Sequence, residues 1–215
     1  MALCLWLIMY ALWCGLPTWA LAQLPAGMPP GVLRYRAQVV REVHFTWGVQ
    51  QPVAVFFAQL HQESAWHAAA RSRYASGLAQ FTPGTARAAQ TRFATLQTLC
   101  ADAAGCPLQP AWAIRALVLW DRFLYQHRNL VQQAEERWGF TLADYNGGPG
   151  WINREILYCR QFGTCDPTRY FGEVQWACGR STPARVPWAC AENRQYPAQI
   201  LYRWRPLYTR WLASG

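Results

Sequence analysis

The chain has 215 residues, of which 53% are hydrophobic and 14% are charged. This balance excludes a disordered protein and suffices for one domain with a packed core. The net charge of +9, with arginine in place of lysine throughout, suits any polyanion. Because no basic run and no phosphate-binding glycine loop accompanies that charge, we expect no nucleic-acid partner.

Residues 3–16 form an apolar run, which is followed by Pro17 and by the small residues of Ala20-Leu21-Ala22. A short apolar core before a small-x-small pattern is typical of a secretory signal peptide. We assign residues 1–22 to a signal peptide cleaved near Ala22, which predicts export. The alternative is a retained membrane anchor, against which the shortness of the apolar run argues.

The mature chain is expected to begin with a loosely ordered linker at residues 23–31, followed by a helix over residues 32–46. Pro52 is well placed as the first residue of the next helix, which runs to Ser64 and is apolar almost all round. Such a helix lies buried at the centre of a domain. Glu63 is at its C-terminal end.

The remainder of the chain also predicts helices rather than strands. Residues 68–81 have little periodicity and predict a loop or short hairpin, after which Thr82 and Pro83 are typical of a helix start. Helices are predicted over residues 83–99, 110–139, 151–161 and 191–211, the last as one helix or two, with a glycine-rich loop at 144–150 and a disulfide-tied irregular insert at 163–190. The sequence therefore predicts an all-α fold.

Six of the eight cysteines lie beyond the N-terminal segment and fall into three local couples. An even number of cysteines in an exported protein indicates disulfide bonds, and proximity favours the pairs Cys100–Cys106, Cys159–Cys165 and Cys178–Cys190. Because no CxxC, HxxxH or HExxH motif is present, we expect no metal site. His61 and His67 are expected on a helix surface or at the edge of a cleft.

Glu63 is followed by no acidic residue until Asp102. A glutamate that closes a mostly apolar helix can be partly buried, which raises its pKa and keeps it protonated near neutral pH. A general acid for a glycosidic bond needs that state. Helix ends carry solvated glutamates routinely, so this position alone favours an ordinary surface residue and the other motifs must decide.

Four short segments follow one another along the chain. They are Glu63-Ser64 with Trp66; Gly77, Leu78, Gln80, Pro83, Thr85 and Ala86; Ala143, Tyr145, Asn146, Gly148 and Gly150; and Glu192, Arg194 and Tyr196. In order and spacing they resemble the motifs of the lytic transglycosylases that carry an SLT-type domain on a goose-lysozyme-like scaffold. The resemblance implies a lysozyme-like helical domain over residues 45–212, preceded by a linker and helix at residues 23–44.

The resemblance also implies roles for individual residues. Glu63 would be the catalytic acid and base, and Ser72 or Ser76 would supply a hydroxyl that contacts it. The other residues expected to bind saccharide are Gln80, Phe81, Tyr145, Asn146 and Tyr196. The segment from Ser72 to Gly77 is about one residue shorter than in the family. The insert at residues 163–190 is not a usual part of such a domain, and we assign it only a rigidifying role at the lower lip of the cleft.

The implied reaction needs one carboxylate and no cofactor. Glu63 would cleave the bond between N-acetylmuramic acid and N-acetylglucosamine, with the substrate's acetamido group in place of a second carboxylate and a 1,6-anhydro ring in the product. The implied location is the bacterial periplasm or cell envelope, with peptidoglycan strands as partner and a conjugation or secretion apparatus as a further one. The alternatives are a hydrolytic muramidase that uses Asp144 as a second carboxylate, and a non-catalytic protein that binds the cell wall.

Overall fold

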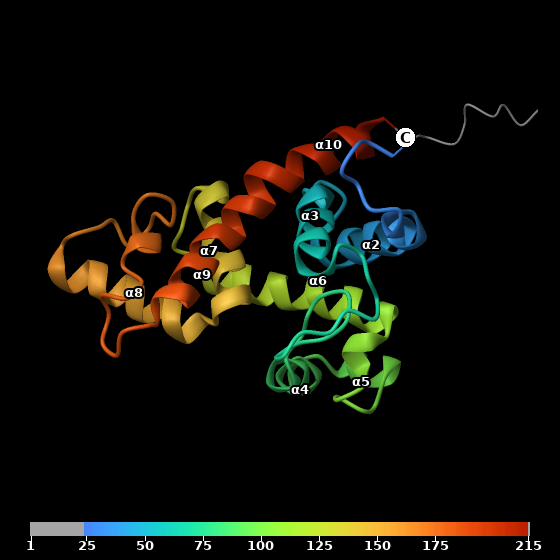
Figure 1. The fold of residues 1–215 in the computed structure, drawn as a ribbon, viewed down its shortest axis with the longest axis horizontal. Helices are drawn as coiled ribbons and strands as arrows, with labels where there is room; N and C mark the ends of the chain where they lie inside the picture. The colour runs from blue at the N-terminus through green and yellow to red at the C-terminus, as the bar shows by residue number, and fades with distance from the viewer. Residues whose placement is uncertain (1–23, 215) are drawn as a thin grey trace, which may run out of the picture.

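The computed structural model describes residues 24–214, so the predicted signal peptide and its cleavage near Ala22 lie outside the described residues. Within the described part the chain is helical, with isolated bridges but no β-sheet, which confirms the all-α prediction (Figure 1). No helix of this part is long and apolar enough to cross a membrane. The α-helices are α2 (Gly31–Trp47), α3 (Val53–Ser64), α4 (Pro83–Arg92), α5 (Ala94–Leu99), α6 (Pro110–His127), α7 (Ala134–Gly147), α8 (Pro149–Phe162), α9 (Pro187–Ala198) and α10 (Arg205–Ala213).

Helix α3 is the centre of the main hydrophobic core. Every residue from Ala54 to His61 is buried, as predicted from the apolar residues on nearly all sides of this helix. Helix α2 packs against it through Val32, Val39 and Val43, which are fully buried and lie on one side of that helix. The expectation for His61 is wrong, because its ring is buried, stacks on Trp204 and shares a hydrogen bond with the Tyr208 hydroxyl.

The C-terminal segment forms one long, nearly continuous helical rod. Helix α9, a wider π-helical stretch η4 (Gln199–Trp204) and helix α10 follow one another without a turn, and the rod runs diagonally from near α8 to the C-terminus in Figure 1. Its first part contacts α7, while η4 and α10 contact α3. The rod therefore joins the helix that ends at Glu63 to the helix that carries Tyr145.

The predicted helix over residues 110–139 is wrong, because the structure divides it. Helix α6 ends at His127, a turn follows, and α7 begins at Ala134. At the turn the Arg128 side chain points inward, where it binds both carboxylate oxygens of Asp144 at 2.7 and 2.5 Å and the side-chain oxygen of Asn153 at 2.8 Å. A charged side chain that is only 7% exposed needs such partners, and a straight helix would not bring them together.

Two smaller boundaries also differ from the prediction. The expected loop at residues 144–150 is mostly helical, since Asp144 to Gly147 complete the last turn of α7 and Pro149 begins α8. The expected helix over residues 83–99 is broken at Phe93, whose backbone is extended and whose side chain packs against the main core. The start of α4 is as predicted, because Thr82 accepts a hydrogen bond from the backbone amide of Thr85.

Residues 68–81 form the predicted loop, folded by two isolated bridges, Arg71 with Ser76 and Ser76 with Phe81. Gly77 has φ of +81°, and a Cβ atom there would overlap the backbone carbonyl of Pro107. Only glycine allows both this positive φ and so close a contact with the Pro107 backbone. The close approach brings this loop onto the segment that carries the first disulfide.

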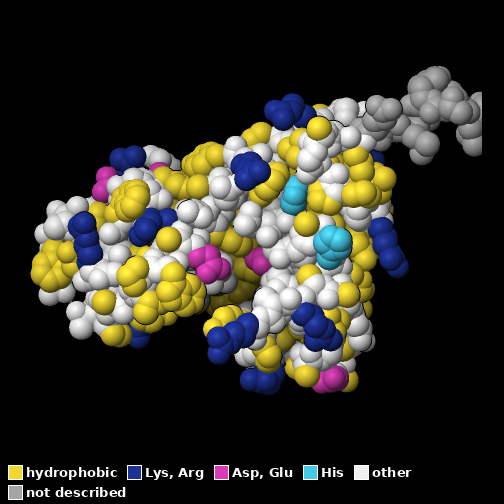
Figure 2. All heavy atoms as spheres, viewed as in Figure 1, with side chains coloured by type: hydrophobic (Ala, Val, Ile, Leu, Met, Phe, Trp, Pro, Cys, Tyr) yellow, Lys and Arg dark blue, Asp and Glu magenta, His cyan; other side chains and the backbone are white. Residues whose placement is uncertain are grey.

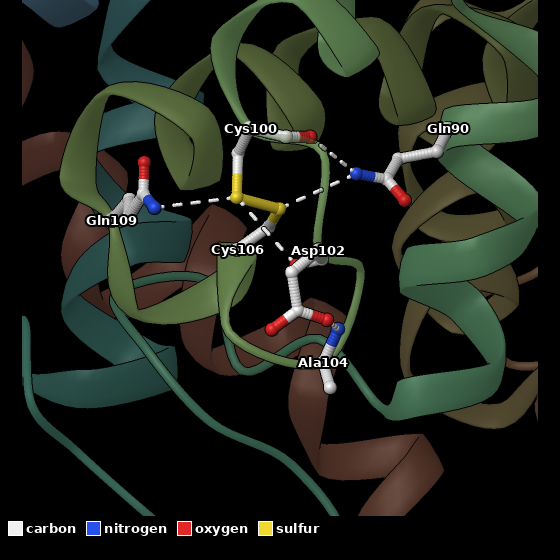
Figure 3. The surroundings of a disulfide bond; sticks show 6 residues. All are labelled: Gln90, Cys100, Asp102, Ala104, Cys106 and Gln109. Carbon is white, nitrogen blue, oxygen red and sulfur yellow. Dashed lines mark hydrogen bonds between the residues drawn. A yellow bond between two sulfur atoms is a disulfide. The ribbon is translucent and has the colours of Figure 1, made fainter.

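All three predicted disulfides are present: Cys100–Cys106, Cys159–Cys165 and Cys178–Cys190. Around the first, shown in Figure 3, the Gln90 amide donates to the Cys100 carbonyl at 2.8 Å, and Asp102 accepts from the Ala104 amide at 3.0 Å. These bonds hold the turn between α5 and the short 3₁₀ turn η2 (Cys106–Leu108). The chain thus passes from α5 to η2 through a short loop that the Cys100–Cys106 disulfide closes.

The insert at residues 163–190 is irregular apart from the 3₁₀ turn η3 (Val174–Trp176) and the first turn of α9. It has its own small core, in which Tyr170 and Val174 pack with Phe140 of α7 and Ile152 of α8. The predicted irregular, disulfide-tied character is therefore confirmed. Since α7 contributes Trp138 to the main core and Phe140 to this smaller one, it joins the insert to the rest of the molecule.

Candidate active site

Glu63 lies in the last turn of α3, and two side-chain hydrogen bonds fix that turn. Ala65 and Trp66 follow it with φ of 46° and 68°, so the chain leaves the helix abruptly. The Trp66 indole donates to the Tyr208 hydroxyl at 2.8 Å, and the Trp204 indole donates to the Gln62 side chain at 2.8 Å. The C-terminal rod therefore holds the end of α3 on both sides of Glu63.

Glu63 faces a cleft of about 460 Å³, a volume typical of small-molecule sites. Figure 2 shows acidic side chains at a hollow in the middle of this face, with hydrophobic surface on its floor. The lining residues come from α3, the 68–81 loop, α4, α6, α7, the insert and α9. They are Gln62, Glu63, Ser72, Tyr74, Ala75, Gln80, Phe81, Thr82, Thr85, Trp120, Tyr145, Asn146, Arg185, Trp188, Ala189, Glu192 and Tyr196.

The Glu63 carboxylate accepts a hydrogen bond from the Tyr196 hydroxyl, which comes from α9. Glu63 keeps some contact with the cleft, but most of its surroundings are protein atoms. This burial raises the pKa of Glu63 to about 8, against the opposing effect of the Tyr196 hydrogen bond and with a further increase from the charge of Glu192. At neutral pH Glu63 therefore carries a proton that it can donate.

The raised pKa predicts that Glu63 makes stability depend on pH. Because the folded-state pKa of about 8 exceeds the value of about 4.3 for a glutamate in an unfolded chain, the stabilisation is complete below about pH 4 and is lost as the pH rises towards 8. Glu63→Gln removes this dependence. Its advantage in unfolding free energy over the wild type should grow by roughly 2 kcal/mol between pH 5 and pH 8.5, a figure reduced for the partial solvent contact of the carboxyl.

Urea unfolding of both proteins at the two pH values measures this difference. Asp121, Asp144 and Glu155 are also buried carboxyl groups with raised pKa values, so the wild type alone would mix four contributions of the same sign. Subtracting the variant isolates Glu63. A difference that stays constant with pH would mean that Glu63 is already ionised in the folded protein.

Tyr145 and Tyr196, both expected to bind saccharide, lie side by side in the cleft. Their ring centroids are 6.5 Å apart and their planes differ by 3°. The Tyr145 hydroxyl donates to the Ala79 carbonyl at 2.6 Å, which fixes the end of α7 against the 68–81 loop. Two phenol rings from α7 and α9 thus form one wall beside Glu63.

Gln80, Phe81 and Asn146 line the same cleft. The Gln80 amide donates to the carbonyls of Gly77 and Ala70 at 2.9 and 3.3 Å, and its φ of 46° turns the loop towards the cleft. Phe81 is only 2% exposed, so it supports the floor more than it offers surface. The Asn146 amide donates to the side chain of Asn193 at 3.1 Å.

Of the two serines expected near Glu63, only Ser72 lines the cleft. Its hydroxyl accepts from the backbone amides of Tyr74 and Ala75, so it closes the turn of its own loop. Ser76 takes part in the two backbone bridges instead. Within residues 24–214 the side-chain hydroxyl bonded to Glu63 is that of Tyr196.

Asp144 does not line the cleft, because it is 1% exposed and bound by Arg128. Of the fourth motif, Arg194 stacks over Trp176 at 4.8 Å while Glu192 reaches the cleft. Sequence reasoning did not place Glu192, Arg185 or Trp188 in the site. The motif spacing put Glu192 one turn before Tyr196 on a helix, which was a usable signal, but nothing in the sequence of the insert distinguished Arg185.

Comparison of the chain with protein-family models and with curated proteins gives no match. The resemblance to lytic transglycosylases therefore depends on the four motifs alone. Each of the four motifs contributes one or two residues to the lining of one cleft.

Proposed function

We propose that this protein is a peptidoglycan lytic transglycosylase in which Glu63 is the single acid and base. The observation that carries the proposal is the protonated Glu63 carboxyl in a cleft, with a pKa of about 8 and the Tyr196 hydroxyl as its hydrogen-bond partner. A carboxyl group that is neutral at pH 7 can protonate a glycosidic oxygen, which an ordinary surface glutamate cannot do efficiently.

The reaction has two proton transfers through the same group. Glu63 first donates its proton to the glycosidic oxygen as the bond from that oxygen to C1 of the muramyl residue breaks, and the substrate's acetamido oxygen stabilises the cationic C1. The Glu63 carboxylate then takes the proton of the muramyl 6-hydroxyl as that oxygen bonds to C1. The proton balance closes, no water is consumed, and the Tyr196 hydroxyl stabilises the carboxylate between the two steps.

The surroundings of Glu63 suit a carbohydrate. Trp120, Trp188 and Tyr145 offer aromatic surface to the apolar faces of sugar rings. The net charge of +9 favours a cell wall whose peptides carry carboxylates. Three disulfides fit an exported protein, and we extend the proposal to the bacterial periplasm or envelope, with a conjugation or secretion apparatus as a partner.

One observation favours a second candidate function, a hydrolytic muramidase. Glu192 lines the cleft and contributes to the raised pKa of Glu63. A carboxylate opposite the acid could activate a water molecule or attack C1 directly. With Asp144 held by Arg128, Glu192 is the group that such a reaction would require.

The products distinguish these functions. Purified peptidoglycan would be digested with residues 23–215 carrying intact disulfides, and the released fragments would be weighed by mass spectrometry. A transglycosylase gives fragments that lack a reducing end and are lighter by one water than the hydrolytic ones. Reducing ends would instead establish the muramidase, and binding without release would establish a protein that only attaches to the cell wall.

A further inference from the structure

The loop closed by Cys178–Cys190 places a positive charge in the cleft. This loop ends in the first turn of α9, the helix that also carries Glu192 and Tyr196. Arg185, near the middle of the loop, lines the same cleft as Glu63. The insert therefore contributes to the site itself and does not only rigidify its edge.

The Arg185 guanidinium is partly buried yet incompletely satisfied. Its Nη1 atom is buried and has no hydrogen-bond partner among residues 24–214. The ion pairs of this part of the chain are Arg115–Glu42, Arg128–Asp144 and Arg205–Glu135, and Arg185 belongs to none of them. A guanidinium has five N–H donors, and outside any ion pair the donors of Arg185 that reach the cleft stay available to a ligand.

The neighbouring residues leave room for the guanidinium. A Cβ atom on Gly147 would lie 2.7 Å from Nη1 and 2.9 Å from Nη2 of Arg185, so the glycine at the end of α7 makes this position possible. The Trp151 ring supports the group from another side, with its centroid 5.7 Å from Cζ. The guanidinium is thus held against Gly147 at the end of α7 and lines the cleft from there.

Two carboxylates lie in this region without neutralising Arg185. Glu155 is 1% exposed, its Oε1 atom also lacks a partner, and the charge of Arg185 acts on it without forming an ion pair. Glu192 lines the cleft but is not bonded to Arg185. The planar fork of a guanidinium is suited to bind a carboxylate through two parallel hydrogen bonds.

We propose that Arg185 is a specificity-determining residue that binds a carboxylate of the substrate in the cleft. The inference rests on the proposed function, because the muramyl unit of peptidoglycan is the source of that carboxylate. It comes either from the lactyl group of a muramyl residue without peptide or from the stem peptide of a substituted one. Uncharged N-acetylglucosamine oligomers have no such group and should not depend on Arg185.

The test compares binding of three ligands by calorimetry, each to protein carrying Glu63→Gln so that no ligand is cleaved. The ligands are chitotetraose, a glycan tetramer with free lactyl carboxylates, and the same tetramer with stem peptides. Arg185→Gln should weaken binding of at least one carboxylate ligand by about 10- to 100-fold, as expected for a hydrogen-bonded charge. Chitotetraose binding should be unchanged, and the ligand that responds identifies the carboxylate.

A matched control is available in the same loop. Arg180 is exposed and does not line the cleft, so Arg180→Gln makes an equal change of net charge and should leave all three affinities unchanged. Arg185→Lys keeps the charge without the fork and should give an intermediate loss. Equal weakening of all three ligands by Arg185→Gln would overturn the proposal in favour of a structural role, and no weakening of any would overturn it as well.

Failure of this proposal and failure of the proposed function give different results. One outcome is that the wild type releases no anhydromuramyl fragments but Arg185→Gln still weakens binding of carboxylate ligands alone. The proposed reaction is then wrong, and the carboxylate-binding role of Arg185 is supported. If the wild type releases these fragments and Arg185→Gln binds all ligands normally, only the role of Arg185 is wrong.

Discussion

Glu63→Gln is expected to lower the release of anhydromuramyl fragments by at least about 10³-fold, since a general acid contributes about 10²–10⁴-fold and Glu63 acts in both steps. Glutamine can neither donate the proton to the leaving oxygen nor accept one from the 6-hydroxyl. Its side-chain oxygen can still accept from the Tyr196 hydroxyl, so the cleft should keep its shape. Fragment release from purified peptidoglycan at pH 7 measures the loss, and chitotetraose binding checks that the cleft is intact.

Glu192→Gln tests whether a second carboxylate takes part, since Glu192 is the other carboxylate that lines the cleft. If Glu63 acts alone, this variant should keep its rate within about tenfold of the wild type. A collapse of activity in both variants would contradict a single acid and base and would favour the hydrolytic muramidase.

Arg128→Ala is expected to destabilise the fold by about 3–5 kcal/mol, because it leaves the Asp144 carboxylate buried without a partner. Asp144 is 1% exposed, and Arg128 holds both of its oxygens. The same guanidinium also reaches Asn153 of α8, so three helices lose a common contact. Urea unfolding with intact disulfides would measure the loss.

Arg115→Ala provides the matched comparison. Arg115 also binds both oxygens of a glutamate, Glu42, at 2.8 Å, but its side chain is 32% exposed. The Glu42 side chain is 10% exposed and solvent reaches the pair from the arginine side, so a loss of about 1–2 kcal/mol, smaller than for Arg128→Ala, is expected. Equal losses in the two variants would mean that Asp144 takes up a proton when Arg128 is removed.

The double variant Arg128→Met with Asp144→Leu separates the cost of an unpaired buried charge from the cost of losing the other contacts of Arg128. Because it removes both charges, it should recover most of the stability that Arg128→Ala loses. Failure to recover would show that the contact with Asn153 or the shape of the turn, and not the unpaired charge, carries the effect.

Features set by neighbouring residues were predictable from the sequence. Thr82 and Pro83 define a helix start through a local hydrogen bond and a fixed backbone angle. The three disulfides join cysteines separated by 6 or 12 positions. The close contact between Gly77 and Pro107, in contrast, joins two segments 30 positions apart and was not predictable from the local sequence.

The break between α6 and α7 was missed for a physical reason. Residues 110–139 have continuous helical propensity, and no proline or glycine marks a stop near His127. The turn is formed where Arg128 meets Asp144 and Asn153, which lie 16 and 25 positions further along the chain. Tertiary contacts of this kind override local propensity.

Periodicity, capping and short cysteine spacing act between near neighbours, so the local sequence was enough to predict that Glu63 ends a buried helix and that disulfides tie the helices. The chemistry of the site, in contrast, depends on contacts between segments that are distant in the chain. The hydroxyl on Glu63 comes from Tyr196, 133 positions away. The pKa of about 8 and the charge of Arg185 in the cleft likewise depend on which distant segments surround one carboxyl group, since burial and electrostatics depend on distance in space and not along the chain.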